Sequence, residues 1–153
     1  MSKPNVGDKA PNFEGVNQDG KKLSLDDFKG KKLILYFYPK DMTPGCTAQA
    51  CNLNENLGEL KKEGFEVVGV SADDEKRHKK FREKHDLNFD LIADTEKDII
   101  NKYGVWGPKQ FMGKKFDGIL RTTFIIDEEG KIEHVIDKVK TKTHTEQIKD
   151  LVS

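Results

Sequence analysis

The chain has two cysteines, Cys46 and Cys51, and both follow closely after the pair Pro44-Gly45. A helical pattern begins there. Cys46 belongs to an apolar stripe at helical spacing, together with Ala50, Leu53, Leu57 and Leu60. In the first turn of a helix, free backbone N–H groups and the positive end of the helix dipole favour a thiolate. The thiolate is the nucleophilic form of cysteine, so the spacing indicates a reactive thiol, with an inert buried cysteine as the alternative.

The elements that must position these cysteines can be predicted from the pattern on either side. Residues 33–38 form an apolar, aromatic run typical of a buried strand, and the helix that follows should end near residue 63, before Gly64. An N-terminal hairpin across Asp19-Gly20 and one helical turn ending at Gly30 should precede the strand. Further strands are expected at residues 66–71, 91–93, 120–127 and 132–137, and further helices at residues 73–84, 96–103 and 143–151.

Strands that alternate with helices, followed by a hairpin and a last helix, predict an α/β protein with a central mixed sheet and helices on its faces. This is the layout of a thioredoxin-like fold. A length of 153 residues suits one domain over residues 1–153, without repeats or linkers.

Charge and composition narrow the classes of partner. Twenty-seven basic and twenty-seven acidic residues cancel, which argues against nucleic acid or an anionic membrane as a partner. Neither a membrane-spanning run nor a signal peptide is visible, so we expect a cytoplasmic protein, in which two cysteines favour redox chemistry. No histidines lie at zinc-ligand spacing, and His78 and His85 are expected to be solvated on one helix.

The spacing Pro39-x-x-x-Thr43-x-x-Cys46 matches the active-site motif of peroxiredoxins, which are thiol peroxidases on a modified thioredoxin fold. The longer string from Asp41 to Thr47, with Cys51 five residues after Cys46, resembles the bacterioferritin comigratory protein (peroxiredoxin Q) subfamily. The resemblance extends from Gly7 to His134 and so covers nearly the whole chain.

The resemblance implies a mechanism and its residues. Cys46 would attack hydrogen peroxide or an alkyl hydroperoxide and become a sulfenic acid. Cys51 would then react with the sulfenic acid to form an intramolecular disulfide, which a thioredoxin-type protein would reduce. A monomer would suffice for this cycle, and no metal or flavin cofactor would be needed. Arg121 stands where the family has its active-site arginine, whose fork of donors stabilises the thiolate and orients the peroxide. Gln49 replaces the glutamate that many peroxiredoxins use to hold this arginine.

Two further residues of the motif have roles that physical chemistry suggests. Thr43 precedes Cys46 by three residues, so its hydroxyl can point to a bound peroxide, cap the helix, or do both. Pro39 lacks an N–H group and has a fixed φ, so it can wall the pocket without adding a competing donor.

The glycines at positions 107 and 113 suggest a phosphate-binding loop, but the pattern fails. Five residues separate these glycines instead of four, and Lys115 stands where Ser or Thr should bind magnesium. We therefore expect a loop over the cleft, with Trp106, Phe111 and Met112 as apolar cover, or with Trp106 in the core.

Two other functions are alternatives to a peroxidase. A thioredoxin-like disulfide reductase would have a Cys-x-x-Cys motif and a proline before the later strand, and the chain has neither. A redox sensor would use Cys46 and Cys51 only as a switch, and it would not need a pocket built from Thr43 and Arg121.

Overall fold

Five strands form the central sheet in the computed structural model, which describes residues 3–152 apart from the Phe111 side chain. Their order is β5 (Asp90–Ala93), β4 (Phe65–Ser71), β3 (Lys32–Phe37), β8 (Thr122–Ile126) and β9 (Ile132–Ile136). The neighbours β5, β4 and β3 are parallel, whereas β8 is antiparallel to both β3 and β9. The predicted mixed sheet is therefore confirmed.

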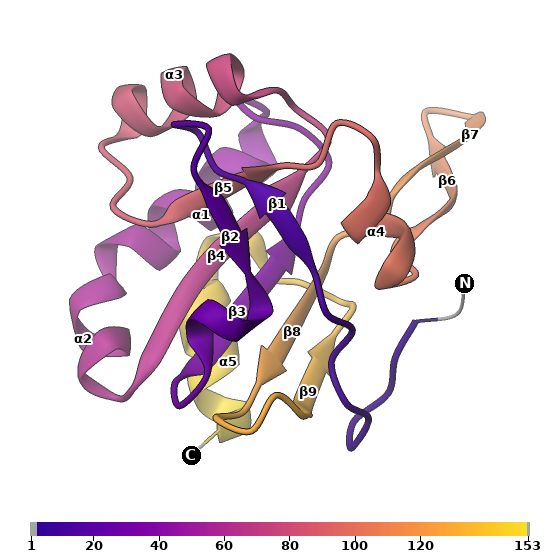
Figure 1. Ribbon diagram of the computed structural model, residues 1–153. Coiled ribbons are helices and arrows are strands. Elements are labelled where there is room, and N and C mark those ends of the chain that lie inside the picture. The colour runs from indigo at the N-terminus through magenta and orange to yellow at the C-terminus, as the bar shows by residue number, and fades with distance from the viewer. Residues whose placement is uncertain (1–2, 153) are drawn as a thin grey trace.

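Side chains of β3 alternate between two apolar cores, as expected for a strand covered on both faces. Leu33, Leu35 and Phe37 belong to the core that the N-terminal segment and α4 (Asp98–Lys102) cover, whereas Ile34 and Tyr36 belong to the other core. The second core is closed by α1 (Pro44–Glu55), α2 (Leu57–Lys62), α3 (Glu75–His85) and α5 (His144–Val152). Figure 1 shows β1 and β2 in front of the sheet, with α1, α2 and α5 behind it.

The N-terminal hairpin forms where the sequence predicts it. β1 (Glu14–Val16) pairs antiparallel with β2 (Lys22–Ser24), and η1 (Leu25–Phe28) supplies the expected helical turn. The side-chain oxygen of Asn17 accepts bonds from the backbone N–H groups of Asp19 and Lys21, and this fixes the turn.

The helix after β3 is not continuous to residue 63 as predicted, because it breaks at Asn56. The Asn56 side chain donates to the carbonyl of Asn52 (2.8 Å), and this bond competes with the helical ladder. A second helix then begins at Leu57. Cys46 and Cys51 both remain in α1, upstream of the break.

The prediction of a loop at residues 107–114 is wrong. β6 (Trp106–Phe111) and β7 (Lys114–Ile119) form an antiparallel hairpin, which projects from the body of the molecule in Figure 1. Both turn residues, Met112 and Gly113, have positive φ, which matches the twist of a two-residue hairpin. Trp106 is not in the core, since it is 37% exposed, and Met112 at the turn is 88% exposed and so does not serve as apolar cover. The predicted role of Phe111 lies outside the described side chains.

Within the described residues 3–152, no helix is both long and apolar enough to cross a membrane.

The first residue of α5 attaches this helix to the sheet. His144 is fully buried, with Nε2 2.9 Å from Thr123 Oγ1 and Nδ1 3.0 Å from Gln147 Oε1. The Gln147 oxygen can only accept, so Nδ1 carries the proton and Nε2 accepts from the Thr123 hydroxyl. Burial lowers the pKa of His144 to about 4, and the charge of Arg121 acts in the same direction.

This depressed pKa predicts acid-dependent stability. Below a pH of about 6.5 the unfolded chain protonates this histidine while the folded protein does not, so the free energy of unfolding should fall by about 2 kcal/mol between pH 7 and pH 5 from this group. Urea unfolding at both pH values should show that His144→Gln removes this part of the loss. His134→Gln, at a half-exposed histidine, is the control. An unchanged pH dependence in His144→Gln would contradict the assignment.

Candidate active site

Cys46 and Arg121 meet at the C-terminal end of β3. Cys46 lies in the first turn of α1 and is 1% exposed, and Arg121 immediately precedes β8. Arg121 Nη2 donates to Cys46 Sγ at 3.3 Å, and Arg121 Nη1 donates to Gln49 Oε1 at 2.7 Å. The guanidinium thus stabilises negative charge on sulfur while the Gln49 amide fixes its plane. This arrangement favours nucleophilic chemistry at Cys46.

Gly45 makes the close approach of Arg121 possible. An ideal Cβ at this position would lie 3.3 Å from Arg121 Nη2, which is closer than an ordinary contact. Helix α1 begins with Pro44. The backbone N–H groups of Gly45 and Cys46 come before the first helical hydrogen bond, which runs from the Thr47 N–H to the carbonyl of Thr43. Backbone donors and the guanidinium therefore converge on the same end of the helix.

Thr43 and Pro39 lie in the segment that connects β3 to α1. Thr43 is the N-cap residue of α1 by position, but its side chain makes no capping bond and instead donates to the carbonyl of Lys40 (2.8 Å). The oxygen lone pairs of Thr43 remain available as acceptors. Pro39 is half-buried directly after the buried Tyr38.

Cys51 lies one and a half turns further along α1 and is half-buried. Burial raises the pKa of the Cys51 thiol, and the charge of Glu55 raises it further. Cys51 is thus held as a neutral thiol. Both cysteines are free, and both belong to one continuous helix.

The projecting hairpin contributes a cation that the sequence did not single out. Lys109 Nζ donates to the carbonyl of Ile119 (2.8 Å), and its aliphatic chain packs over Gly118. Burial lowers the pKa of Lys109, the charge of Arg121 adds to this effect, and the negative charge of Cys46 opposes it. Lys109 therefore lies in the electrostatic field of the cysteine.

The expectation that His78 is solvated is wrong. His78 is fully buried, because its ring bonds to the buried carboxylate of Asp41 (2.6 Å) and to the carbonyl of Ile92 (2.9 Å), and only His85 stays half-buried at the surface. Possible ligand atoms of Asp41, Asp73 and His78 lie within 4.8 Å of one another. Protein groups already engage these atoms, so the arrangement is a hydrogen-bond network rather than a metal site.

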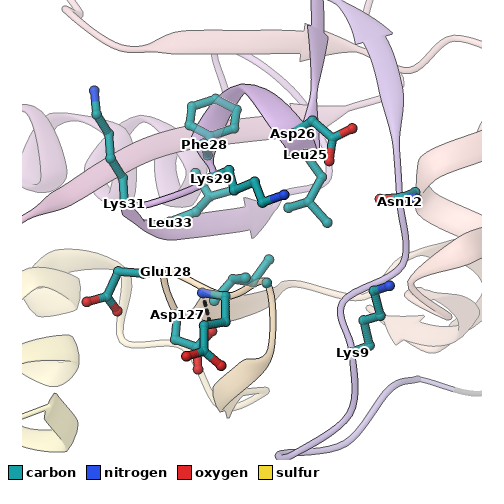
Figure 2. A pocket seen from close by; sticks show the side chains of 13 residues that line it. Lys9, Asn12, Leu25, Asp26, Phe28, Lys29, Lys31, Leu33, Asp127 and Glu128 are labelled. Atoms are coloured by element: carbon teal, nitrogen blue, oxygen red, sulfur yellow. Dashed lines mark hydrogen bonds between the residues drawn. The ribbon is translucent and has the colours of Figure 1, made fainter.

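A surface hollow of about 200 Å³ lies at the opposite end of the sheet from Cys46. Figure 2 shows Leu25 and Phe28 of η1 above it and Asp127 and Glu128 of the turn between β8 and β9 below it. Neither cysteine nor Arg121 lines the hollow, so the candidate active site is elsewhere.

Comparison with known proteins agrees with the geometry. Residues 6–135 match the model of the AhpC/TSA family. The chain is 50% identical to peroxiredoxin Bcp of Escherichia coli over 144 residues, which cover 94% of this chain and 92% of that protein.

Solved structures confirm the thioredoxin-like fold and the predicted resemblance. A cysteine-to-serine variant of PrxQ from Xylella fastidiosa has a TM-score of 0.91 at 29% identity, with 98% of this chain and 96% of that chain covered. The bacterioferritin comigratory protein of Xanthomonas campestris, from a study of its alkyl peroxide reduction activity, has a TM-score of 0.84 at 33% identity, with 91% and 89% covered.

The fork of Arg121 generates a prediction. Arg121→Lys keeps a positive charge but cannot bond Gln49 and Cys46 in one plane, so oxidation of Cys46 by hydrogen peroxide should slow by at least about tenfold. Rapid-mixing measurements on a Cys51→Ser background, which leaves one thiol, give this rate. Arg82→Lys on α3 is the control, and thermal unfolding should show that both variants stay folded. Oxidation of Arg121→Lys at the parent rate would contradict the role of the fork.

Proposed function

The chain belongs to the AhpC/TSA family, and its homology to peroxiredoxins identifies it as a thiol peroxidase; on this premise we propose that Cys46 is the peroxidatic cysteine and Cys51 the resolving cysteine. The observation that carries the proposal is the bond from Arg121 Nη2 to Cys46 Sγ at the start of α1. A nucleophile that must be ionised lies against a permanent cation there.

The first step is attack of the Cys46 thiolate on one oxygen of the peroxide. An S–O bond forms while the O–O bond breaks, Cys46 becomes a sulfenic acid, and the leaving oxygen takes up a proton to become water or an alcohol. Arg121 donors stabilise the charge that develops on the oxygens. Because the Thr43 proton is engaged by Lys40, Thr43 orients the substrate by accepting a bond from the peroxide O–H. Pro39 forms part of the wall of the pocket in which the peroxide binds.

The second step joins the two cysteines. The Cys51 sulfur attacks the sulfenic acid sulfur, an S–S bond forms, and the hydroxyl leaves as water with the Cys51 proton. A thioredoxin-type dithiol then reduces the disulfide by exchange. Both cysteines belong to one chain, so a monomer suffices, and we place the cycle in the cytoplasm, where such reductants are maintained.

Peroxide consumption with thioredoxin, thioredoxin reductase and NADPH tests this function. Cys46→Ser should abolish turnover, because a serine hydroxyl is almost never ionised at neutral pH. Cys51→Ser should consume one peroxide per chain and then stall, with a sulfenic acid that a trapping reagent detects. Turnover in Cys46→Ser would overturn the assignment of Cys46, and stoichiometric oxidation without turnover in the parent protein would favour a sensor.

Disulfide formation requires α1 to open. Residues five apart in a regular helix have Cα atoms about 8.6 Å apart, whereas a disulfide tolerates at most about 7 Å. Asn52, next to Cys51, holds the helix closed against α5 and against η2 (Thr141–Thr143), the short helix just before it. Its side chain donates to the carbonyl of Lys142 (3.0 Å) and accepts from the Thr145 N–H (2.8 Å). Oxidation must therefore unwind α1 and strain or break these bonds.

Amide hydrogen exchange on reduced and oxidised protein measures this opening. Protection across residues 47–53 should drop on oxidation, because the helix is lost locally. Asn52→Ala should speed disulfide formation by up to about thirtyfold, since about two net hydrogen bonds, each near 1 kcal/mol, no longer resist unwinding. Asn88→Ala, which removes a side chain outside α1, is the control. Equal protection in both redox states would mean that Cys51 is not the partner.

A further inference from the structure

Asp41 is a fully buried carboxylate that the peroxidase mechanism above does not use. It lies two residues before Thr43, in the segment that leads into α1. Its Oδ1 accepts from the Tyr38 hydroxyl at 2.5 Å, and its Oδ2 lies 2.6 Å from His78 Nδ1. A buried charge with such short contacts is held by its neighbours rather than by water.

The proton positions in this cluster follow from its partners. His78 Nε2 faces the carbonyl of Ile92 (2.9 Å), which can only accept, so Nε2 carries a proton. Burial raises the pKa of Tyr38 well above its ordinary value, and the charge of Asp41 raises it further, so the hydroxyl remains a donor. The 2.6 Å contact between His78 Nδ1 and Asp41 Oδ2 is a hydrogen bond and so contains one more proton. The pair is therefore neutral overall and satisfied inside the core.

The backbone of Asp41 is held as well as its side chain. Its N–H donates to Asp73 Oδ2 (2.8 Å), and its carbonyl accepts from Arg77 Nη2 (3.0 Å). Asp73 is itself fixed by the Ser71 hydroxyl (2.7 Å) and by an ion pair with Arg77 (3.2 Å). The connecting segment is thus held at Asp41 by hydrogen bonds to Asp73 and to Arg77 of α3, and Ser71 of β4 fixes Asp73.

These hydrogen bonds maintain an unusual backbone conformation at the next residue, Met42. Met42 has φ of 65°, a left-handed conformation that an unbranched residue other than glycine adopts only at a cost of about 1 kcal/mol or more. Such a conformation persists when the surrounding structure imposes it. It reverses the chain so that Thr43 can begin α1 with Cys46 against Arg121.

We propose that Asp41 and His78 are positioning residues for peroxide reduction, which hold the segment from Pro39 to Thr43 in the geometry that the substrate requires. The proposal rests on the assignment of Cys46 and Thr43 above. The two side chains act through Thr43 and the start of α1, and neither touches the substrate. The hydrogen bonds, rather than the charges, carry the effect, because the pair is neutral overall.

The test compares two reactions of Cys46 on the Cys51→Ser background. Oxidation by hydrogen peroxide needs an aligned substrate, whereas alkylation by iodoacetamide needs only a thiolate. Asp41→Ala should slow oxidation roughly tenfold, as expected when reacting groups shift by a fraction of an ångström, and should change alkylation by less than about twofold. Asp41→Asn should stay within about twofold of the parent in both reactions, because an amide can accept from Tyr38 and donate to neutral His78 Nδ1.

Two more variants keep the test decisive. Asp41→Ala combined with His78→Leu removes both members of the pair, so the imidazole is not left in the core without the carboxylate. Its oxidation should be no slower than that of Asp41→Ala alone, because both residues belong to one network. His85→Leu, on the same helix but half-buried, is the matched control and should react like the parent.

Three results would overturn the proposal: oxidation at the parent rate in Asp41→Ala or in the double variant, a parallel loss of oxidation and alkylation, or an Asp41→Asn variant as slow as Asp41→Ala. Cys46→Ser separates this proposal from the proposed function. If Cys46→Ser is inactive while Asp41→Ala is unimpaired, only the positioning role is wrong. If Cys46→Ser still turns over peroxide, the assignment of the peroxidatic cysteine is wrong.

Discussion

The contact between the Arg121 guanidinium and the Cys46 sulfur is the interaction on which the rest of the site depends. It joins two segments 75 residues apart in the sequence, and it forms only because β8 lies next to β3 in the sheet. Gly45 leaves room for the guanidinium, and the buried Gln49 oxygen turns its plane toward the sulfur. A larger residue at position 45 would compete for the space that the cation occupies.

Helix α1 must satisfy two opposed requirements in the proposed cycle. Attack on a peroxide requires an ordered first turn, because donors fixed in advance stabilise developing charge best. Disulfide formation requires the same helix to open between Cys46 and Cys51. The break at Asn56 limits α1 to residues 44–55, and the bonds of Asn52 to η2 and to the start of α5 set how firmly it is closed. The stability of a few turns therefore determines which step is favoured.

Buried polar groups surround this helix and give its position a precision that apolar packing alone would not supply. Asp41 and His78 fix the segment before α1, and His144 fixes the helix α5 that packs beside it. Each group has its partners inside the protein, so burial is compatible with folding. Hydrogen bonds are directional and weaken when the donor and acceptor are displaced, whereas apolar contacts tolerate small displacements of the packed groups.

The sequence alone predicted most of the elements and indicated a reactive thiol at Cys46, because both predictions depend on local patterns. Periodicity predicted the five strands of the central sheet, most of the helices and the face of α1 that buries Cys46, and the cysteine motif indicated the family. Only the tertiary structure decided how residues distant in sequence meet. The burial of His78 depends on Asp41, a partner 37 residues away, so its helix pattern alone suggested a solvated histidine. The hairpin of β6 and β7 was missed because its turn, Met112-Gly113, lacks the usual asparagine or aspartate, and only its backbone twist identifies it.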